Sequence, residues 1–365
     1  MRIVSSAPGR CGIVGNPTDM YGGSVIACST RERAECVIET GGYGVILRAD
    51  EQSLQVRSHD DLTPRGDNQD LARVAVRDLG AFEKGVPFAL STRTSIPMQA
   101  GLAGSTAMLT AIVGAILSLM DRHLSRHEMA ELIRGIEYRS MGVVCGFQDA
   151  YMAVFGGLNY MDFRGKDSFS PQDEQSPLAT VETLDHVIRV PSRQPCAGMS
   201  SPMDSTVRMP DPTGLLMQRA QPERLPFVLA HTGVKHHSGT VHKSPRERWR
   251  AGEPAFVDGY AEVARLAGVG KRALLRGDWP TMADQMNRNH AIVRDLGGSG
   301  DANEAMIAAA LAGGAIGAKL AGAGGGGTIL ALTLDPDRTI AALVDAGADA
   351  ILRPEPSTGL SVEIG

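Results

Sequence analysis

Apolar and polar positions along the first part of the chain predict a series of short strands. The apolar or alternating runs read RIVSSAPGR, GIVG, SVIACST, ECVIET and GVILRA, and Pro8-Gly9 should break the first of them. Apolar positions that recur every three to four residues predict helices over 68–80, 107–120 and 127–140, with the strand PFALSTRTSIP after the first helix. Residues 150–163 predict a short helix, a Gly-Gly turn and another strand.

The pattern is interrupted in the middle of the chain. Residues 164–224 are rich in Pro, Ser, Gln and Asp and contain one strand-like piece, DHVIRVP, which indicates an extended inter-domain segment with a loop or insertion. After it, strands are expected at PFVLAHTG, at TILALTL and at the C-terminus. The helical patterns of this half cover 254–276, 279–295, 301–313 and 336–346.

This mixture of strands and helices predicts an α+β protein with two domains. The length of 365 residues is also typical of two domains. We expect an N-terminal domain over 1–190, a linker or insertion over 191–224 and a C-terminal domain over 225–365.

Composition and charge argue against several kinds of protein. The chain is 43% hydrophobic with a formal net charge of −5, so nothing draws it as a whole to nucleic acid or to an anionic membrane. No apolar run approaches the roughly 20 residues of a membrane span, and the N-terminus lacks the apolar core of a signal peptide. The five cysteines form no CxxC pair, which favours free thiols. We expect a cytoplasmic protein, monomeric or homodimeric, without nucleic-acid or membrane partners.

The stretch QAGLAGSTAMLTA, which begins at Gln99, places glycines and a Ser-Thr pair directly before an apolar helical run. A helix N-terminus presents unpaired N–H groups and a positive dipole end, and Gly101 and Gly104 would let the backbone wrap an oxyanion closely. Ser105 and Thr106 add hydroxyls for a phosphate or its Mg²⁺. The stretch is no Walker A loop, because GxxxxGK[ST] is absent. The alternative is a loop that merely caps a core helix.

Two more segments combine glycines with polar groups. APGRCGIVGNPTDMYGG, residues 7–23, carries handles suited to hydroxyls and anions, although a polar turn between strands would look the same. These handles are Arg10, Asn16, Asp19 and Tyr21. In KLAGAGGGGTILAL, residues 319–332, the glycines precede a strand, whereas a dinucleotide fold needs strand, glycines and then helix.

Taken in order, the three segments resemble the motifs of the GHMP kinase superfamily over most of the chain. The pattern PG(R/K)…G(E/N)…D…GG is matched by Pro8, Gly9, Arg10, Gly15, Asn16, Asp19, Gly22 and Gly23. The pattern P…GLxxSTA is matched by Pro97, Gly101, Leu102, Ser105, Thr106 and Ala107, and K…GAGGGG by Lys319 and Gly322 to Gly327. Within the superfamily, GNPTDMYGG with QAGLAGSTA is similar to glucuronokinases, and GFQDAYMAVFGGLNYMDF with GAKLAGAGGGG is similar to heptose-phosphate kinases.

The resemblance implies a fold and a reaction. The expected fold has an N-terminal domain with a left-handed βαβ unit, a C-terminal ferredoxin-like α/β sandwich and an active site in the cleft between them. ATP with Mg²⁺ would phosphorylate a small-molecule sugar, with a uronic acid such as glucuronate as the first choice. The phosphates would lie on the second motif, at Pro97, Gly101, Leu102, Ala103, Gly104, Ser105 and Thr106.

The resemblance also implies roles for single side chains. Asp149 in CGFQDAY would take the proton of the acceptor hydroxyl or orient that hydroxyl, and Arg10 would stabilise charge on the transferred phosphoryl group. Ser105 and Glu137 would be Mg²⁺ ligands. Substrate contacts would come from Asn16, Asp19, Tyr21, Gly324 and Gly325, with Tyr151 a weaker candidate. From the residues alone, Asp149 could instead be a helix N-cap and Glu137 a solvated helix glutamate.

Some features leave the interpretation open. The basic, His-rich segment 231–249 is either a loop that enters the substrate cleft or a solvated loop and helix start; metal binding is a poor fit. Its candidates for an anionic sugar are Lys235, His236, Ser238 and Arg246, and His290 is undecided. The alternative functions are a heptose-phosphate kinase, a galactokinase-like or mevalonate kinase-like enzyme, or a non-catalytic sensor of sugar or nucleotide. Arg10 with Asn16 weighs against mevalonate, and the order of glycines and strand against a dehydrogenase.

Overall fold

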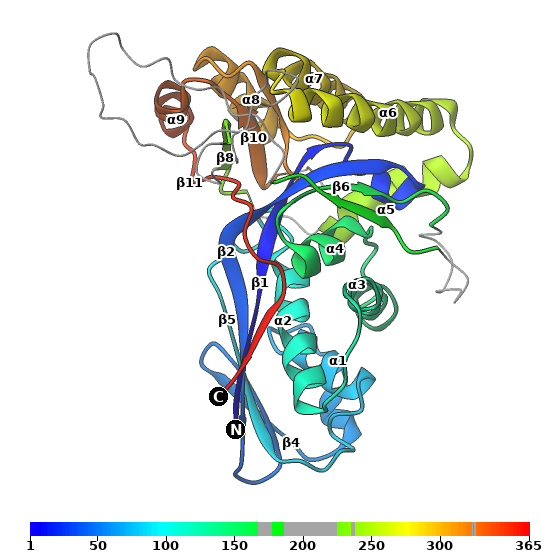
Figure 1. Cartoon of the computed structure of the whole chain (residues 1–365), viewed down its shortest axis with the longest axis vertical. Coiled ribbons are helices and arrows are strands. Elements are labelled where there is room, and N and C mark those ends of the chain that lie inside the picture. The colour runs from blue at the N-terminus through cyan, green and yellow to red at the C-terminus, as the bar shows by residue number, and fades with distance from the viewer. Residues whose placement is uncertain (167–176, 186–224, 235–237, 323, 325) are drawn as a thin grey trace, which may run out of the picture.

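The computed structural model describes residues 1–166, 177–185, 225–234, 238–322, 324 and 326–365. The described chain forms two layered α+β units stacked along the long axis of the molecule, and the N- and C-termini lie side by side at one end (Figure 1). The first unit is built on an eight-stranded sheet with the order β12-β1-β2-β5-β3-β4, to which β6 and β7 add beside β2. Its strands are β1 (Arg2–Val14), β2 (Ser24–Thr40), β3 (Val45–Ala49), β4 (Gln52–Val56), β5 (Phe88–Thr94), β6 (Leu158–Asp162), β7 (Thr180–Thr183) and β12 (Ser361–Ile364).

The first two strands are longer than the sequence pattern predicts. RIVSSAPGR and GIVG form the single strand β1, and SVIACST and ECVIET form the single strand β2. The expected break at Pro8-Gly9 is wrong, because a register shift between Pro8 and Arg10 absorbs the proline without ending the strand. The shift also turns the chain at Arg10, which is one of the site residues.

A crossover in the first unit covers one face of this sheet with helices. Strand β3 pairs with β5 in parallel, and the connection between them contains β4, the short helix η2 (His59–Leu62) and α1 (Asp70–Asp78). The helices α2 (Gly104–Leu119), α3 (Arg126–Gly135) and α4 (Gln148–Phe155) lie on the same side (Figure 1). Helix α2 contacts β1 and β2 on one side and α1, α3 and α4 on the other, which explains why its sequence is apolar almost all round.

The second unit has the layered arrangement expected of a ferredoxin-like sandwich. Its antiparallel sheet has the order β11-β8-β10-β9, which is the order of a β-α-β-β-α-β chain once the helices are placed between the strands. The strands are β8 (Phe227–His231), β9 (Gly317–Leu320), β10 (Thr328–Leu332) and β11 (Ala350–Leu352). The helices are α5 (Ser238–Arg250), α6 (Pro254–Arg276), α7 (Trp279–Asp295), α8 (Asp301–Ala312) and α9 (Pro336–Asp345).

The end of the chain returns to the first unit. Strand β12 pairs with β1, so the expected C-terminal strand joins the N-terminal sheet. The piece DHVIRVP lies outside the described residues except for its first residue, while β7 extends the first sheet beside β6. The described cysteines are free thiols, and no helix of the described residues is long and apolar enough to span a membrane.

Candidate functional site

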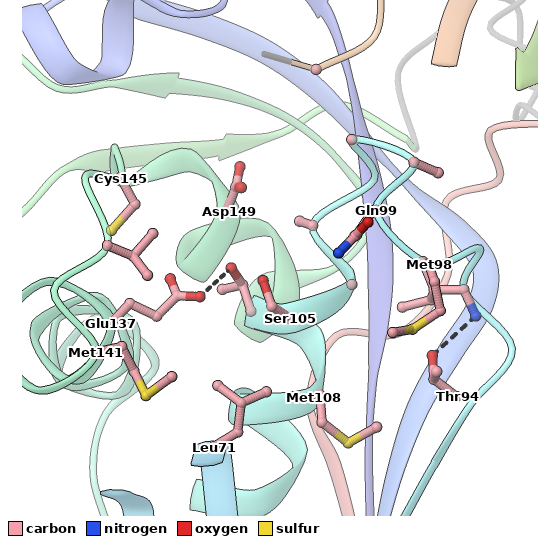
Figure 2. A pocket seen from close by; sticks show the side chains of 18 of the residues that line it. Leu71, Thr94, Met98, Gln99, Ser105, Met108, Glu137, Met141, Cys145 and Asp149 are labelled. Atoms are coloured by element: carbon pink, nitrogen blue, oxygen red, sulfur yellow. Dashed lines mark hydrogen bonds between the residues drawn. The ribbon is translucent and has the colours of Figure 1, made fainter. Parts of the chain in front are cut away.

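The loop between β5 and α2 ends in a helix N-terminus that no side chain caps. Gly101 and Ala103 both adopt left-handed backbone conformations, with φ of 74° and 58°, which turn the chain sharply into the helix. Ala103 is the N-cap residue, and its methyl group cannot accept a hydrogen bond from the first turn. The N–H groups of the first turn therefore remain available to an anion, and Ser105 is exposed beside them at the rim of a cavity (Figure 2).

Arg10 connects this loop to helix α4. Its Nε donates to Asp149 Oδ1 at 2.7 Å and its Nη1 donates to the carbonyl oxygen of Gly101 at 2.7 Å. Burial alone would lower the pKa of Arg10, but the adjacent Asp149 carboxylate raises it above its ordinary value, so the side chain is always a cation. The Asp149 side chain is still 26% exposed. Asp149 does not act as the helix N-cap that the sequence left as an alternative, because its carboxylate faces Arg10 and the cavity.

Glu137 is a buried carboxylate at the same cavity. Its Oε1 accepts a hydrogen bond from the Thr106 hydroxyl at 2.7 Å (Figure 2). Burial, together with the charge of Asp149, raises the pKa of Glu137 to about 7, against the lowering effect of the Thr106 hydrogen bond. A π-helical turn, η3 (Ile136–Ser140), carries it, and such turns are frequent at functional sites. Glu137 is therefore not the solvated helix glutamate that the sequence left as an alternative.

The carboxylate of Asp19, which the resemblance implied as a substrate contact, caps a helix in the structure. Its Oδ2 accepts the backbone N–H groups of Phe147 and Gln148 at 2.8 and 3.0 Å, and its Oδ1 accepts from Gln148 Nε2 at 3.0 Å. The carboxylate thus caps α4 from a loop far away in the sequence, and a Cβ at Gly146 would collide with it. Burial raises the pKa of Asp19 to about 7. Asp19 borders the cavity but is only 1% exposed, with both oxygens already engaged.

The other side chains expected to bind substrate also have protein partners. Asn16 is buried, and its Oδ1 accepts from Lys319 Nζ at 2.8 Å while its Nδ2 donates to the carbonyl oxygen of Gly322 at 3.3 Å. Tyr21 stacks on Tyr260 with ring centroids 4.4 Å apart. Gly324 has a φ of 91°, and a Cβ there would collide with the carbonyl oxygen of Gly298; Gly325 lies outside the described residues.

Most of the His-rich segment is helical, which agrees better with the alternative of a loop and helix start than with a cleft loop. Helix α5 begins at Ser238, whose side chain, like Lys235 and His236, lies outside the described structure. Arg246 on this helix donates from Nη2 to Tyr138 Oη at 3.2 Å. His290 is buried with its Nε2 3.0 Å from Glu304 Oε1, and burial lowers the pKa of its imidazole. Within the described residues, no group of three or more His, Cys, Asp or Glu side chains could hold a metal ion.

These residues surround a cavity of about 480 Å³. One part is polar, with Arg10, Asp149, Glu137 and the first turn of α2 around it. Apolar side chains from α1, α2, the 95–103 loop and the end of η3 also line it (Figure 2). These are Leu71, Met98, Met108 and Met141, and polar residues such as Asp67, Asn68 and Thr94 lie among the lining residues too. Pro97 lines the cavity as expected, and Gly322 is the described lining residue that comes from the second unit.

Sequence reasoning missed two features of this site. The capping contact of Asp19 carries no local signal, because its partners lie 128 and 129 residues away. Lys319 was noted only as part of a motif, although a lysine inside the otherwise apolar strand GAKL is itself an unusual polar residue in a core strand.

Comparisons with known proteins agree on one family. The family model described as GHMP kinases N terminal domain matches residues 70–157, and the one described as GHMP kinases C terminal matches residues 271–349. Glucuronokinase 1 of Arabidopsis thaliana is 28% identical over 87% of this chain and 81% of its own length. A mevalonate kinase of Pyrococcus abyssi is 24% identical over 99% of this chain and 98% of its own. The crystal structure of Lactococcus lactis galactokinase with galactose has a TM-score of 0.70 at 15% identity, and the alignment covers 99% and 95% of the two chains.

Proposed function

The chain belongs to the GHMP kinases, and from that premise we propose that it is an ATP-dependent kinase that phosphorylates a uronic acid such as glucuronate to the sugar 1-phosphate. Membership of the family makes it a phosphotransferase with an alcohol group as acceptor. The observation that carries the proposal is the pair of Arg10 and Asp149, which faces an uncapped helix N-terminus in one cavity.

ATP fits the division of the cavity into a polar and an apolar part. The phosphates would lie on the first turn of α2, where the backbone N–H groups of residues 104–106 and the helix dipole attract negative charge. The adenine ring would lie in the apolar part, between methionines whose flexible thioethers pack well against a flat ring. These two requirements, an anion site and an apolar slot, occur together in the described cavity.

Magnesium fits the oxygens at the polar end. A hydroxyl and a carboxylate, Ser105 and Glu137, are the hard ligands that Mg²⁺ takes when phosphates and water complete its shell. Burial raises the pKa of Glu137 and the charge of Asp149 adds to that rise, so a divalent cation at this place would favour the ionised carboxylate. When bound, the ion would neutralise charge on the phosphate oxygens. The roles of the protein side chains described next do not depend on where the ion lies.

Phosphoryl transfer then depends on how two side chains are held. The acceptor oxygen attacks the γ-phosphorus, the bond from that phosphorus to the bridging oxygen breaks, and ADP leaves. Asp149 hydrogen-bonds the acceptor hydroxyl and can take its proton, because its carboxylate is partly exposed to the cavity. Arg10 is a permanent cation next to both Asp149 and the Gly101 carbonyl, so it can stabilise charge that develops on the transferred group.

The choice of a uronic acid rests on the relatives named glucuronokinase, at 28% and 29% identity over 87% of this chain. The sequence candidate for the sugar carboxylate is Arg246, whose Nη2 donates to Tyr138 Oη. Neither residue is among those that line the described cavity, so Arg246 stays a candidate on sequence grounds alone.

The experiment is a coupled ADP-release assay with Mg-ATP over a panel of acceptors. The panel contains glucuronate, galacturonate, galactose, a heptose 7-phosphate and mevalonate, and Asp149→Ala is the matched inactive control. We expect the highest kcat/KM with glucuronate and loss of that activity in the variant. Mevalonate or a heptose phosphate as the best acceptor would replace the proposed substrate, and ATP binding without turnover of any acceptor would favour a sensor.

A further inference from the structure

Lys319 is a fully buried lysine that crosses from the second unit into the first. It lies on β9, the edge strand of the C-terminal sheet, and its side chain is 1% exposed. Its Nζ donates to Asn16 Oδ1 at 2.8 Å and to the carbonyl oxygen of Gly12 at 3.3 Å, and it also contacts the carbonyl oxygen of Leu320. Three acceptors match the three protons of an ammonium group, so the geometry is that of a charged lysine.

Burying the ammonium group of Lys319 makes an unfavourable contribution to the free energy of folding. Burial lowers the pKa of Lys319 to about 7, the thiol of Cys11 raises it and the charge of Arg10 lowers it. His290 on α7 also interacts with Lys319 and is itself paired with Glu304. A methionine of similar length would fill the space without this cost. The lysine therefore has to be explained by what its three hydrogen bonds hold.

The hydrogen bonds of Lys319 hold the loop that leads to Asp19. Asn16 is fixed from the second unit at three points, because its backbone oxygen also accepts from Asn289 Nδ2 at 3.2 Å and its Nδ2 donates to Gly322. Three residues later, Asp19 caps the N-terminus of α4, and Asp149 stands in the first turn of that helix. Two sets of buried polar contacts, one at Asn16 and one at Asp19, are thus joined by the short chain segment between these residues and connect β9 with the helix of Asp149.

The same strand leads to the phosphate loop from the other side. Gly322 follows β9 by two residues and packs so closely on the carbonyl group of Gly101 that a Cβ would collide with it. The Gly101 carbonyl in turn accepts from Arg10, the partner of Asp149. The second unit thus contacts both sides of the polar end of the cavity, through Lys319 at Asn16 and through Gly322 at Gly101.

We propose that Lys319 is a positioning residue: its ammonium group fixes Asn16 and, through the loop to Asp19, keeps Asp149 in place beside Arg10. Lys319 touches neither nucleotide nor acceptor in this account. The kinetic test of this inference rests on the proposed function. The hydrogen-exchange test does not, because it requires no enzymatic activity.

The first test compares Lys319→Met with Thr339→Val. Thr339 is equally buried in the second unit and bonds only within it, to Thr333 and Gly313 by its side chain, so its variant controls for loss of a buried polar contact. We expect hydrogen exchange in a peptide over 145–152 to accelerate about tenfold or more in Lys319→Met and to stay at the wild-type rate in Thr339→Val. Unchanged exchange over 145–152 in Lys319→Met would overturn the inference, whatever the protein phosphorylates.

The second test separates positioning from general destabilisation by kinetics. With the best acceptor of the panel, kcat of Lys319→Met should fall about tenfold to a hundredfold while KM for ATP changes little. If the charged form of Lys319 holds Asn16, kcat should fall as the pH rises through the pKa of this lysine, which burial lowers to about 7. Asn16→Asp puts a carboxylate in place of the amide that accepts from Lys319, which raises the pKa of the lysine and should move this alkaline limb of the kcat profile up by about one pH unit. An alkaline limb that stays in place in Asn16→Asp, or that survives in Lys319→Met, would contradict the proposal. A wild-type protein that phosphorylates none of the acceptors would instead refute the proposed function and leave the exchange test to decide on Lys319.

Discussion

Replacing Asp19 distinguishes a helix cap from a substrate ligand. In the structure its Oδ2 alone accepts the two backbone N–H groups at the start of α4. Asp19→Asn keeps one oxygen for these bonds and presents a neutral side chain, which resembles the protonated form of a carboxyl whose pKa burial raises to about 7. Asp19→Ala removes both bonds and leaves two buried N–H groups without acceptors.

The magnitude follows from these contacts. Each buried N–H group left without an acceptor costs about 1–3 kcal/mol, so Asp19→Ala, which leaves two, should lose roughly 2–6 kcal/mol of unfolding free energy. For a protein of this size that corresponds to a fall in Tm of roughly 3–8 °C. Asp19→Asn should lose about 1 kcal/mol or less. Because Asp149 stands next to the cap, kcat should fall about a hundredfold in Asp19→Ala and less than about tenfold in Asp19→Asn.

Differential scanning fluorimetry and steady-state kinetics with the best acceptor measure both effects. Both variants lack the negative charge of Asp19, but only Asp19→Asn keeps an oxygen that faces the helix, so the two form a matched pair. The reasoning would be refuted if Asp19→Asn raised KM for the acceptor as strongly as Asp19→Ala while Tm stayed unchanged in both. That result would assign Asp19 to the acceptor hydroxyls, as the sequence resemblance implied.

Other predictions concern the nucleotide and acceptor groups. Metal binding needs an ionised Glu137. The apparent affinity for Mg²⁺, measured with a fluorescent ATP analogue, should therefore fall about tenfold per pH unit below pH 7. An affinity that stays constant from pH 5.5 to 8, or the same pH dependence in Glu137→Gln, would contradict this role. Arg10→Lys should keep a positive charge but lose the two-pronged contact with Asp149 and Gly101, and we expect kcat/KM to fall about a hundredfold at unchanged Tm. Ala103→Gly should raise Tm or leave it unchanged, because glycine adopts the left-handed conformation at no steric cost, and a clear loss of Tm would contradict the assigned backbone strain. Arg246→Met should raise KM for glucuronate more than KM for galactose, and equal effects on both sugars would separate Arg246 from the carboxylate.

Local signals explain which elements of the fold could be predicted. Helices α6 and α7 begin and end at the expected residues because Pro254 follows the N-cap, Gly277 ends α6 in a left-handed conformation and Asp278 caps α7. The expected break in β1 failed because a bulge absorbs Pro8, and a bulge depends on the partner strand. Helix α5 was not predicted as a full helix, since the sequence left open a cleft loop or a loop with a helix start, and Pro245 inside it obscures the helical pattern.

Features of the candidate site that depend on neighbouring residues could be predicted from the sequence, whereas those that depend on packing between distant segments could not. The glycines before α2 indicate an anion site directly from the sequence, and the structure has an uncapped helix N-terminus there. The family resemblance singled out Asp149 and Arg10, and the fold brings them into contact. The roles of Asp19 and Lys319 depend on partners that the fold brings from more than a hundred residues away, and no periodicity or spacing encodes such a contact.

The most direct test of the central claim is a ³¹P NMR time course of the protein with Mg-ATP and glucuronate. The account predicts that the γ-phosphate signal disappears as a phosphate-ester signal of the sugar grows at the same rate, and that Asp149→Ala abolishes both changes. Release of inorganic phosphate in place of a sugar ester, or a sugar ester formed equally fast by the variant, would contradict a kinase that works through this cavity.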